Sequence, residues 1–84
     1  MYKILFSPKA RRQYLKLGKP IQKRISVALR RLIFKPERHV TKLVGFDAYR
    51  LRVGDYRVIL DIKKEKLVVL IIQIGHRRSI YKNP

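Results

Sequence analysis

The chain has 84 residues, enough for one domain (residues 1–84) with a modest core, and its 22 Lys or Arg against five Asp or Glu give a net charge of +17. Such a field repels itself and indicates a polyanion or an acidic protein as partner, while the 46% hydrophobic content excludes a disordered polyelectrolyte. Cysteine is absent and only two histidines occur, so disulfides, metal sites and other cofactors are not expected.

The first half of the chain predicts one strand and two helices. Residues 2–7 alternate like a short strand, and Ser7 is the expected N-cap of a helix with Pro8 in its first turn and Gly18 as its C-cap. A second amphipathic helix is expected from Pro20 to Phe34, with an apolar face formed by Ile21, Ile25, Ala28, Leu29, Leu32 and Ile33. We expect the cations on its other face to be solvated or to contact phosphates non-specifically; these are Lys23, Arg24, Arg30 and Arg31.

The second half predicts strands at residues 48–53, 56–62 and 67–74, after a connecting loop at 35–47. Turns are expected at Gly54-Asp55 and at the four residues 63–66. The longest apolar run, 67–72, has strand length, so we expect no membrane span, no signal peptide and a cytoplasmic protein. The order β-α-α-β-β-β predicts an α+β fold in which a helical hairpin packs on a four-stranded, mainly antiparallel sheet.

A two-residue turn at Gly54-Asp55 also predicts the register of the hairpin around it. Arg52 should face Arg57 across the strands, and alternation places Arg50 on the same side of the sheet. Like charges directly opposite each other destabilise a sheet, and arginine offers a donor fork that matches phosphate. We interpret this face as an anion site, with a plain solvated face as the competing interpretation.

The C-terminal segment is expected to join this site. If Ile62 pairs with Leu67, Ile74 lies opposite Asp55, and residues 75–81 emerge beside the Gly54-Asp55 turn. That placement would bring three further side chains to the arginines, namely His76, Arg77 and Tyr81. Lys42, near the end of the connecting loop, and Arg78 are further candidates for phosphate contacts.

The segments "KLVGFDAYRLRVGDYRVIL" (42–60) and "LVVLIIQIGHRRSIY" (67–81) resemble the RelE/ParE superfamily of prokaryotic toxins, and most closely its RelE branch. The resemblance implies a RelE-like fold and a ribosome-dependent, metal-independent endoribonuclease that cleaves mRNA in the ribosomal A site. It also implies a cognate RelB-like antitoxin, the ribosome and mRNA as partners, with operator DNA contacted only through the antitoxin complex.

The same resemblance implies roles for individual residues. The family's strand cations fall on Arg50 and Arg52, its transition-state arginine on Arg57, the arginine of its C-terminal motif on Arg77 and its terminal aromatic on Tyr81. The best-known RelE proteins carry lysines where this chain has Arg50 and Arg52. Arginine stays protonated, so neither residue is a natural general base.

Metal-free RNA cleavage needs a base for the 2′-OH, a stabilised phosphorane and a proton for the 5′-oxygen. Arg57 and Arg52 suit the phosphorane, and Arg50 the RNA backbone. Histidine is the side chain that titrates near neutrality, so His76 is the candidate base, unless it only caps the strand or packs on Tyr81. Arg77 is the candidate acid or phosphate clamp.

Tyr81, in this scheme, orients the nucleotide or stacks on a base. Three other functions stay open at this point. They are a ParE-like inhibitor of DNA gyrase with the same fold, a non-catalytic basic nucleic-acid-binding protein, and a degenerate, non-toxic relative.

Overall fold

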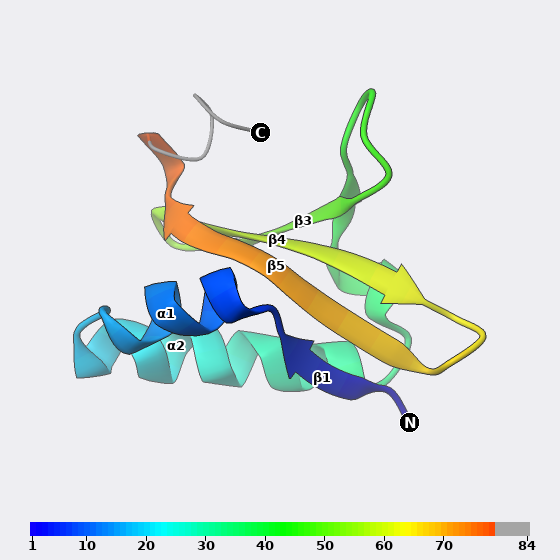
Figure 1. Cartoon of the computed structure of the whole chain (residues 1–84), viewed down its shortest axis with the longest axis horizontal. Helices are drawn as coiled ribbons and strands as arrows, with labels where there is room; N and C mark the ends of the chain where they lie inside the picture. The colour runs from blue at the N-terminus through cyan, green and yellow to red at the C-terminus, as the bar shows by residue number, and fades with distance from the viewer. Residues whose placement is uncertain (79–84) are drawn as a thin grey trace.

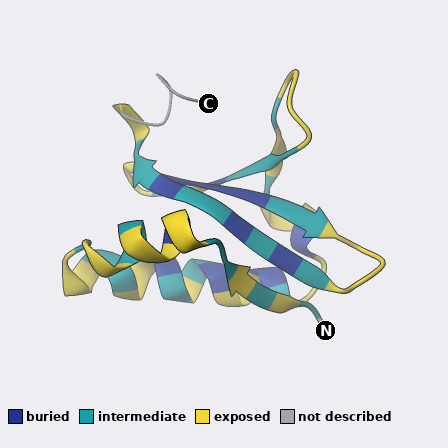
Figure 2. Ribbon diagram, in the orientation of Figure 1, coloured by how far each residue is buried: buried dark blue, intermediate teal, exposed yellow. Residues whose placement is uncertain are grey.

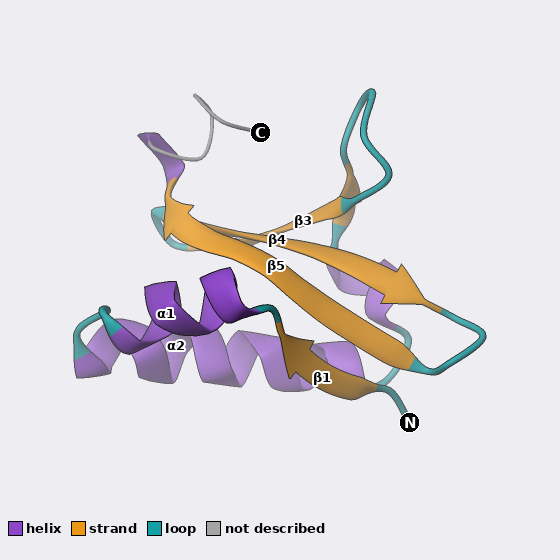
Figure 3. Cartoon of the chain, viewed as in Figure 1, coloured by secondary structure: helices purple, strands orange, loops and turns teal. Residues whose placement is uncertain are grey.

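The computed structural model describes residues 1–78, and in it two helices cover one face of a mixed sheet (Figure 1). The elements, shown by type in Figure 3, are β1 (Lys3–Phe6), α1 (Pro8–Leu15), α2 (Lys19–Arg30), the 3-10 helices η1 (Arg31–Ile33) and η2 (Pro36–His39), β2 (Thr41–Lys42), β3 (Tyr49–Val53), β4 (Tyr56–Lys63) and β5 (Val68–His76). The predicted α+β class, a helical hairpin on a sheet, is confirmed. No helix in the described part of the chain is long and apolar enough to cross a membrane.

The first helix, α1, begins where capping chemistry predicts, but it ends early. The Ser7 hydroxyl accepts a hydrogen bond from the Ala10 amide at 3.0 Å, as expected of an N-cap. The prediction that Gly18 is a C-cap is wrong, because α1 ends at Leu15 and Gly18 is the N-cap of α2. Pro20 explains the difference, since proline is favoured in a first helical turn and therefore draws the start of α2 toward Gly18.

The second helix also ends before the predicted Phe34. Its last regular residue is Arg30, and η1 continues the chain as a tighter turn to Ile33. Lys35 then adopts the left-handed region at φ 48°, which turns the chain into Pro36 and η2. The face predicted to be apolar is the face that packs on the sheet.

Within residues 1–78 the sheet has five strands in the order β1-β5-β4-β3-β2, against the four predicted. The additional strand is β2, which lies inside the expected loop and pairs with the start of β3. Two residues cannot show a strand periodicity, so the sequence pattern did not reveal it. β1 pairs with β5 in parallel, with Lys3 opposite Val68, and forms the other edge of the sheet.

The predicted register of β3 and β4 is confirmed, whereas that of β4 and β5 is wrong. Arg52 lies opposite Arg57, but Ile74 lies opposite Val58 and not opposite Asp55. Similarly, Ile62 pairs with Val69 and not with Leu67. The register differs because the connecting turn comprises residues 64–67, with Leu67 at φ 54°, and because an irregularity follows between Ile59 and Leu60.

The irregularity decides which side chains of β5 reach the core. Ile59 pairs with Gln73 and Leu60 with Ile71, which leaves Ile72 as an extra residue of β5. Ile71 and Ile74 therefore both face the helices although they are three positions apart, and both are buried. Without the extra residue, the end of β5 would present its opposite face.

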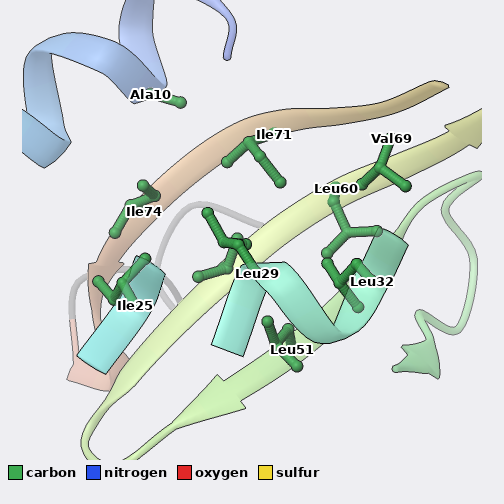
Figure 4. Close-up of a cluster of buried hydrophobic side chains, with 10 residues drawn as sticks. Ala10, Ile25, Leu29, Leu32, Leu51, Leu60, Val69, Ile71 and Ile74 are labelled. Carbon is green, nitrogen blue, oxygen red and sulfur yellow. The ribbon is translucent and has the colours of Figure 1, made fainter. Parts of the chain in front are cut away.

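The core lies between the helices and this face of the sheet. Figure 4 shows Ile25, Leu29 and Leu32 of the α2–η1 segment directed at strand residues, which include Leu51, Leu60, Val69, Ile71 and Ile74. Burying one such side chain contributes about 1.5–3 kcal/mol to folding. Buried and partly buried positions alternate along the first part of β5, as Figure 2 shows, because alternate residues point to opposite faces. In β4 the residues from Arg57 to Leu60 are all buried, so this strand is covered on both faces.

Candidate active site

The open face of the sheet carries the predicted arginine pair. Arg57 lies opposite Arg52 on β3 and opposite Gly75 on β5. Paired residues point to the same side, so all three share the face that the helices do not cover. Arg50 lies two residues before Arg52 and belongs to the same face. Since Gly75 has no side chain, β5 places nothing of its own beside Arg57 at this register position.

Arg57 is only 5% exposed, which makes it a buried cation among the described residues. Its Nη1 donates to the carbonyl oxygens of Gly54 at 3.4 Å and Tyr56 at 3.3 Å, so the side chain lies against the hairpin turn. Arg52 is exposed, and Arg50 is partly buried. Strand alternation predicts to which face of the sheet a side chain points, but not how much of it is exposed. The burial of Arg57 is therefore seen only in the structure. It gives the guanidinium a fixed orientation beside the exposed charge of Arg52.

The end of β5 reaches the same turn. The backbone amide of Arg77 donates to the Asp55 carbonyl at 2.8 Å. The expected convergence of this segment with the hairpin is therefore present, although it arises from a longer β5 and not from the predicted register. The side chains of Arg77 and Arg78 are exposed. Tyr81 lies outside the described residues.

His76 is placed differently from Arg57. It pairs with Tyr56, and the two rings make an edge-to-face contact with centroids 5.5 Å apart. The register puts this pair on the helix side of the sheet, away from the arginine pair. The Nδ1 atom of His76 accepts a hydrogen bond from the Arg78 amide at 3.4 Å, so the ring packs on Tyr56 rather than extending from the strand end. A role in proton transfer stays a prediction.

Lys42 lies at the far end of the hairpin from the arginine pair. It pairs with Tyr49, and its Nζ donates to Asp47 at 3.0 Å and lies 4.9 Å from the centre of the Tyr49 ring. The hydrogen bond to Asp47 raises the pKa of Lys42 above its ordinary value. The structure thus brings Arg50, Arg52, Arg57 and the backbone of Arg77 together, and it leaves Lys42 engaged elsewhere.

The side chains that could bind a metal ion are scattered in the described part of the chain. Within residues 1–78, no group of three or more His, Cys, Asp or Glu side chains is arranged to hold a metal ion.

The sequence pattern also did not show that cations of α2 line a groove together with the end of β3. Helical periodicity places these cations on the outer face of α2, but it cannot show which strand lies beside them.

Comparison with known proteins defines the class of the protein. Residues 4–81 match the family described as the ParE toxin of type II toxin–antitoxin systems, parDE. The chain therefore belongs to this family, and the predicted membership of the RelE/ParE superfamily is confirmed.

Particular relatives lie in the RelE branch. The mRNA interferase toxin RelE of Escherichia coli strain K12 is 30% identical over 79 residues, which cover 90% of this chain and 83% of that protein. A chain in the intact E. coli RelBE toxin–antitoxin complex has a TM-score of 0.78 at 30% identity, covering 90% of this chain and 96% of that one. A chain in the RelBE2 toxin–antitoxin complex of Mycobacterium tuberculosis has a TM-score of 0.82 at 29% identity, covering 90% and 98%. The predicted RelE-like fold is thereby confirmed.

Proposed function

We propose that this chain is the toxin of a type II toxin–antitoxin system and an endoribonuclease that cleaves mRNA. The observation that carries the proposal is the cross-strand pair of Arg52 and Arg57, with Arg57 buried against the hairpin turn and Arg77 tied to that turn by its backbone. The family match and the similarity to a protein named mRNA interferase support the same function.

The proposed reaction is a transesterification that needs no metal. The 2′-oxygen of one nucleotide attacks the adjacent phosphorus, the bond from phosphorus to the 5′-oxygen breaks, and a 2′,3′-cyclic phosphate and a 5′-hydroxyl result. Arg57 and Arg52 stabilise the phosphorane, because their charges are fixed before negative charge develops on its oxygens. Arg50, on the same face, positions the RNA backbone.

Proton transfer is assigned to the C-terminal segment. We propose His76 as the general base for the 2′-OH and Arg77 as acid or phosphate clamp, with Tyr81 orienting the nucleotide or stacking on a base. To act on RNA at the arginine pair, the His76 ring must leave its contact with Tyr56 on the helix side of the sheet and turn toward the open face. It must also release the 3.4 Å hydrogen bond that its Nδ1 accepts from Arg78. A domain this small offers few positioning contacts, so we propose that the ribosome supplies them and that cleavage takes place in the A site.

The partners proposed for the chain follow from its relatives and from its charge. The similar solved structures include RelB–RelE antitoxin–toxin complexes, and a net charge of +17 favours an acidic partner. We propose a cognate RelB-like antitoxin, with operator DNA bound only through that complex. Action on mRNA during translation places the protein in the cytoplasm.

The proposal is tested by inducing the chain alone in cells and mapping the 5′ ends of mRNAs. A ribosome-dependent nuclease produces cuts at a fixed position within codons, in frame, across translated regions. Arrest of DNA replication without such cuts would identify a ParE-like gyrase inhibitor. RNA binding with neither effect would identify a non-catalytic binding protein.

A further inference from the structure

A second basic surface lies behind the edge of β3. A groove of about 580 Å³ runs between the exposed side of α2 and the end of β3. Its cationic lining residues are Lys23, Arg24, Arg31 and Arg52, and its apolar ones include Val27 and Val53. Three of the four cations are arginines, which come from α2, from η1 and from the distant β3.

These four cations have no partners among residues 1–78. All are exposed, and none forms a hydrogen bond or an ion pair through its side chain with another described residue. By contrast, three lysines elsewhere each have a carboxylate within 4.0 Å, namely Lys42, Lys63 and Lys64. Unpaired like charges around one groove repel each other, so the groove is electrostatically arranged for an anion.

The groove is continuous with the arginine pair. The register directs Arg52 to the open face of the sheet and Val53 to the helix side. In the described part of the chain, β2 covers β3 only at Tyr49 and Arg50, so the other end of β3 is an edge of the sheet. The open face and the groove therefore meet at Arg52.

We propose that this groove binds the sugar–phosphate backbone of the single-stranded RNA that flanks the scissile phosphate. The inference rests on the proposed function, because the Arg52–Arg57 pair defines where the cut falls. A positively charged groove that follows the backbone is a feature by which proteins hold single strands. Val27, 44% exposed, adds apolar surface between the cations of this groove. The arginine forks can bind phosphate oxygens through two parallel hydrogen bonds.

The experiment measures binding of RNA oligonucleotides whose 2′-oxygens are methylated, so that they cannot be cleaved. Oligonucleotides of 3 and 12 nucleotides are titrated by fluorescence anisotropy between about 50 and 300 mM KCl. The groove variant is Arg24→Ala/Arg31→Ala. The matched control is Arg38→Ala/Lys66→Ala, which removes the same charge from two exposed residues outside the groove. Thermal unfolding of both variants verifies that they remain folded.

For single strands the slope of log K against log salt is about −0.7 per phosphate contact. The groove variant lacks two of these contacts, so the magnitude of its slope with the 12-mer should be smaller by about 1.4. Its slope with the 3-mer should equal that of the parent, and the control variant should match the parent with both oligonucleotides. An unchanged 12-mer slope overturns the inference, as does an equal loss in the control. Unchanged RNA binding with lost antitoxin binding would make the groove a protein-docking surface. If the expected slopes are found but the parent cuts no mRNA, RNA binding by the groove is supported and the proposed nuclease activity is contradicted.

Discussion

Arg57 is a cation held in a largely buried position, and both its charge and its shape should matter for cleavage. A guanidinium near the hairpin turn can donate two parallel hydrogen bonds to a phosphate, whereas an ammonium acts as a single point of charge. We expect Arg57→Ala and Arg57→Lys both to lower cleavage on programmed ribosomes by about 100-fold or more, the usual cost of losing one transition-state donor.

The two substitutions separate catalysis from stability, because Arg57→Lys keeps the charge and much of the side-chain volume. Circular dichroism and thermal unfolding should show a folded Arg57→Lys protein. Arg38→Ala, on the distant η2, serves as the control and should cleave like the parent. A folded Arg57→Lys protein as active as the parent would remove this residue from the mechanism.

The second prediction for a single residue concerns His76. We expect His76→Ala to lower the single-turnover cleavage rate by about 10- to 1,000-fold, the range of one general acid–base group. A general base acts in its unprotonated form, so a base role also predicts that the parent's rate rises with pH and that the variant loses this dependence. Rates are measured across pH 5.5–8.5.

His76→Phe is the matched variant, because it preserves the ring contact with Tyr56 while removing both nitrogens. Cleavage restored by phenylalanine would mean that His76 acts by packing. In that case the proton-transfer role passes to Arg77, Tyr81 or the ribosome.

At the scale of elements, the N-cap residue of α1 and a residue of its second turn replace a missing strand beside β5. β1 ends at Phe6, opposite Ile71, and beyond that point the Ser7 hydroxyl donates to the Ile72 carbonyl at 2.9 Å. Gln13 then accepts a hydrogen bond from the Ile74 amide at 2.7 Å through its Oε1. These two bonds satisfy the backbone of β5 where it approaches Gly75 and the arginine pair.

We expect Gln13→Met to lower the free energy of unfolding by about 1–3 kcal/mol, because it leaves the Ile74 amide without an acceptor. Gln13→Glu replaces the amide oxygen by a carboxylate oxygen at the same reach and should retain most of the stability. Urea unfolding measures the difference, and amide exchange at Ile74 should become faster in the methionine variant alone. Equal exchange in the two variants would show that the bond does not hold β5.

How far the sequence predicts this fold also differs from element to element. The β3–β4 register was predictable, because a two-residue turn at Gly54-Asp55 fixes the pairing of every residue beyond it. The β4–β5 register was not, because it depends on Leu67 in a left-handed conformation and on the extra residue Ile72. Neither feature has a local sequence signal, since leucine and isoleucine are ordinary strand residues.

The candidate site divides in the same way. Alternation along β3 and β4 predicted that Arg52 and Arg57 share a face, whereas the packing of His76 on Tyr56 depends on the end of β5 and could not be derived. The groove beside α2 depends on which helix face lies next to which strand, and only the tertiary structure gives that relation.

For the whole molecule, the dominant property is a charge of +17 that the described fold offsets with only a few ion pairs. We expect the acidic protein encoded by the adjacent gene to bind the native chain and to raise its unfolding midpoint. At a free concentration one hundred times Kd, the stabilisation is about 2.7 kcal/mol. Thermal scans with and without that protein measure the shift. Poly-glutamate is the control for charge alone, and an equal shift with it, or no shift with the antitoxin, would contradict a specific complex.

The position of β5 between β1 and β4 has a consequence for the order of events during synthesis. β1, α1 and α2 emerge first, but their apolar faces pack on strands that are translated last, and Lys3 finds its partner only when Val68 is made. Such non-local pairing is slow and must wait for distant segments. Until β5 has emerged, the nascent chain therefore lacks the strand that joins β1 to β4 and the Arg57–Gly75 register. We therefore expect a nascent copy to lack the assembled arginine site until β5 is in place, and a partner that binds it earlier to meet a sheet that has not yet formed.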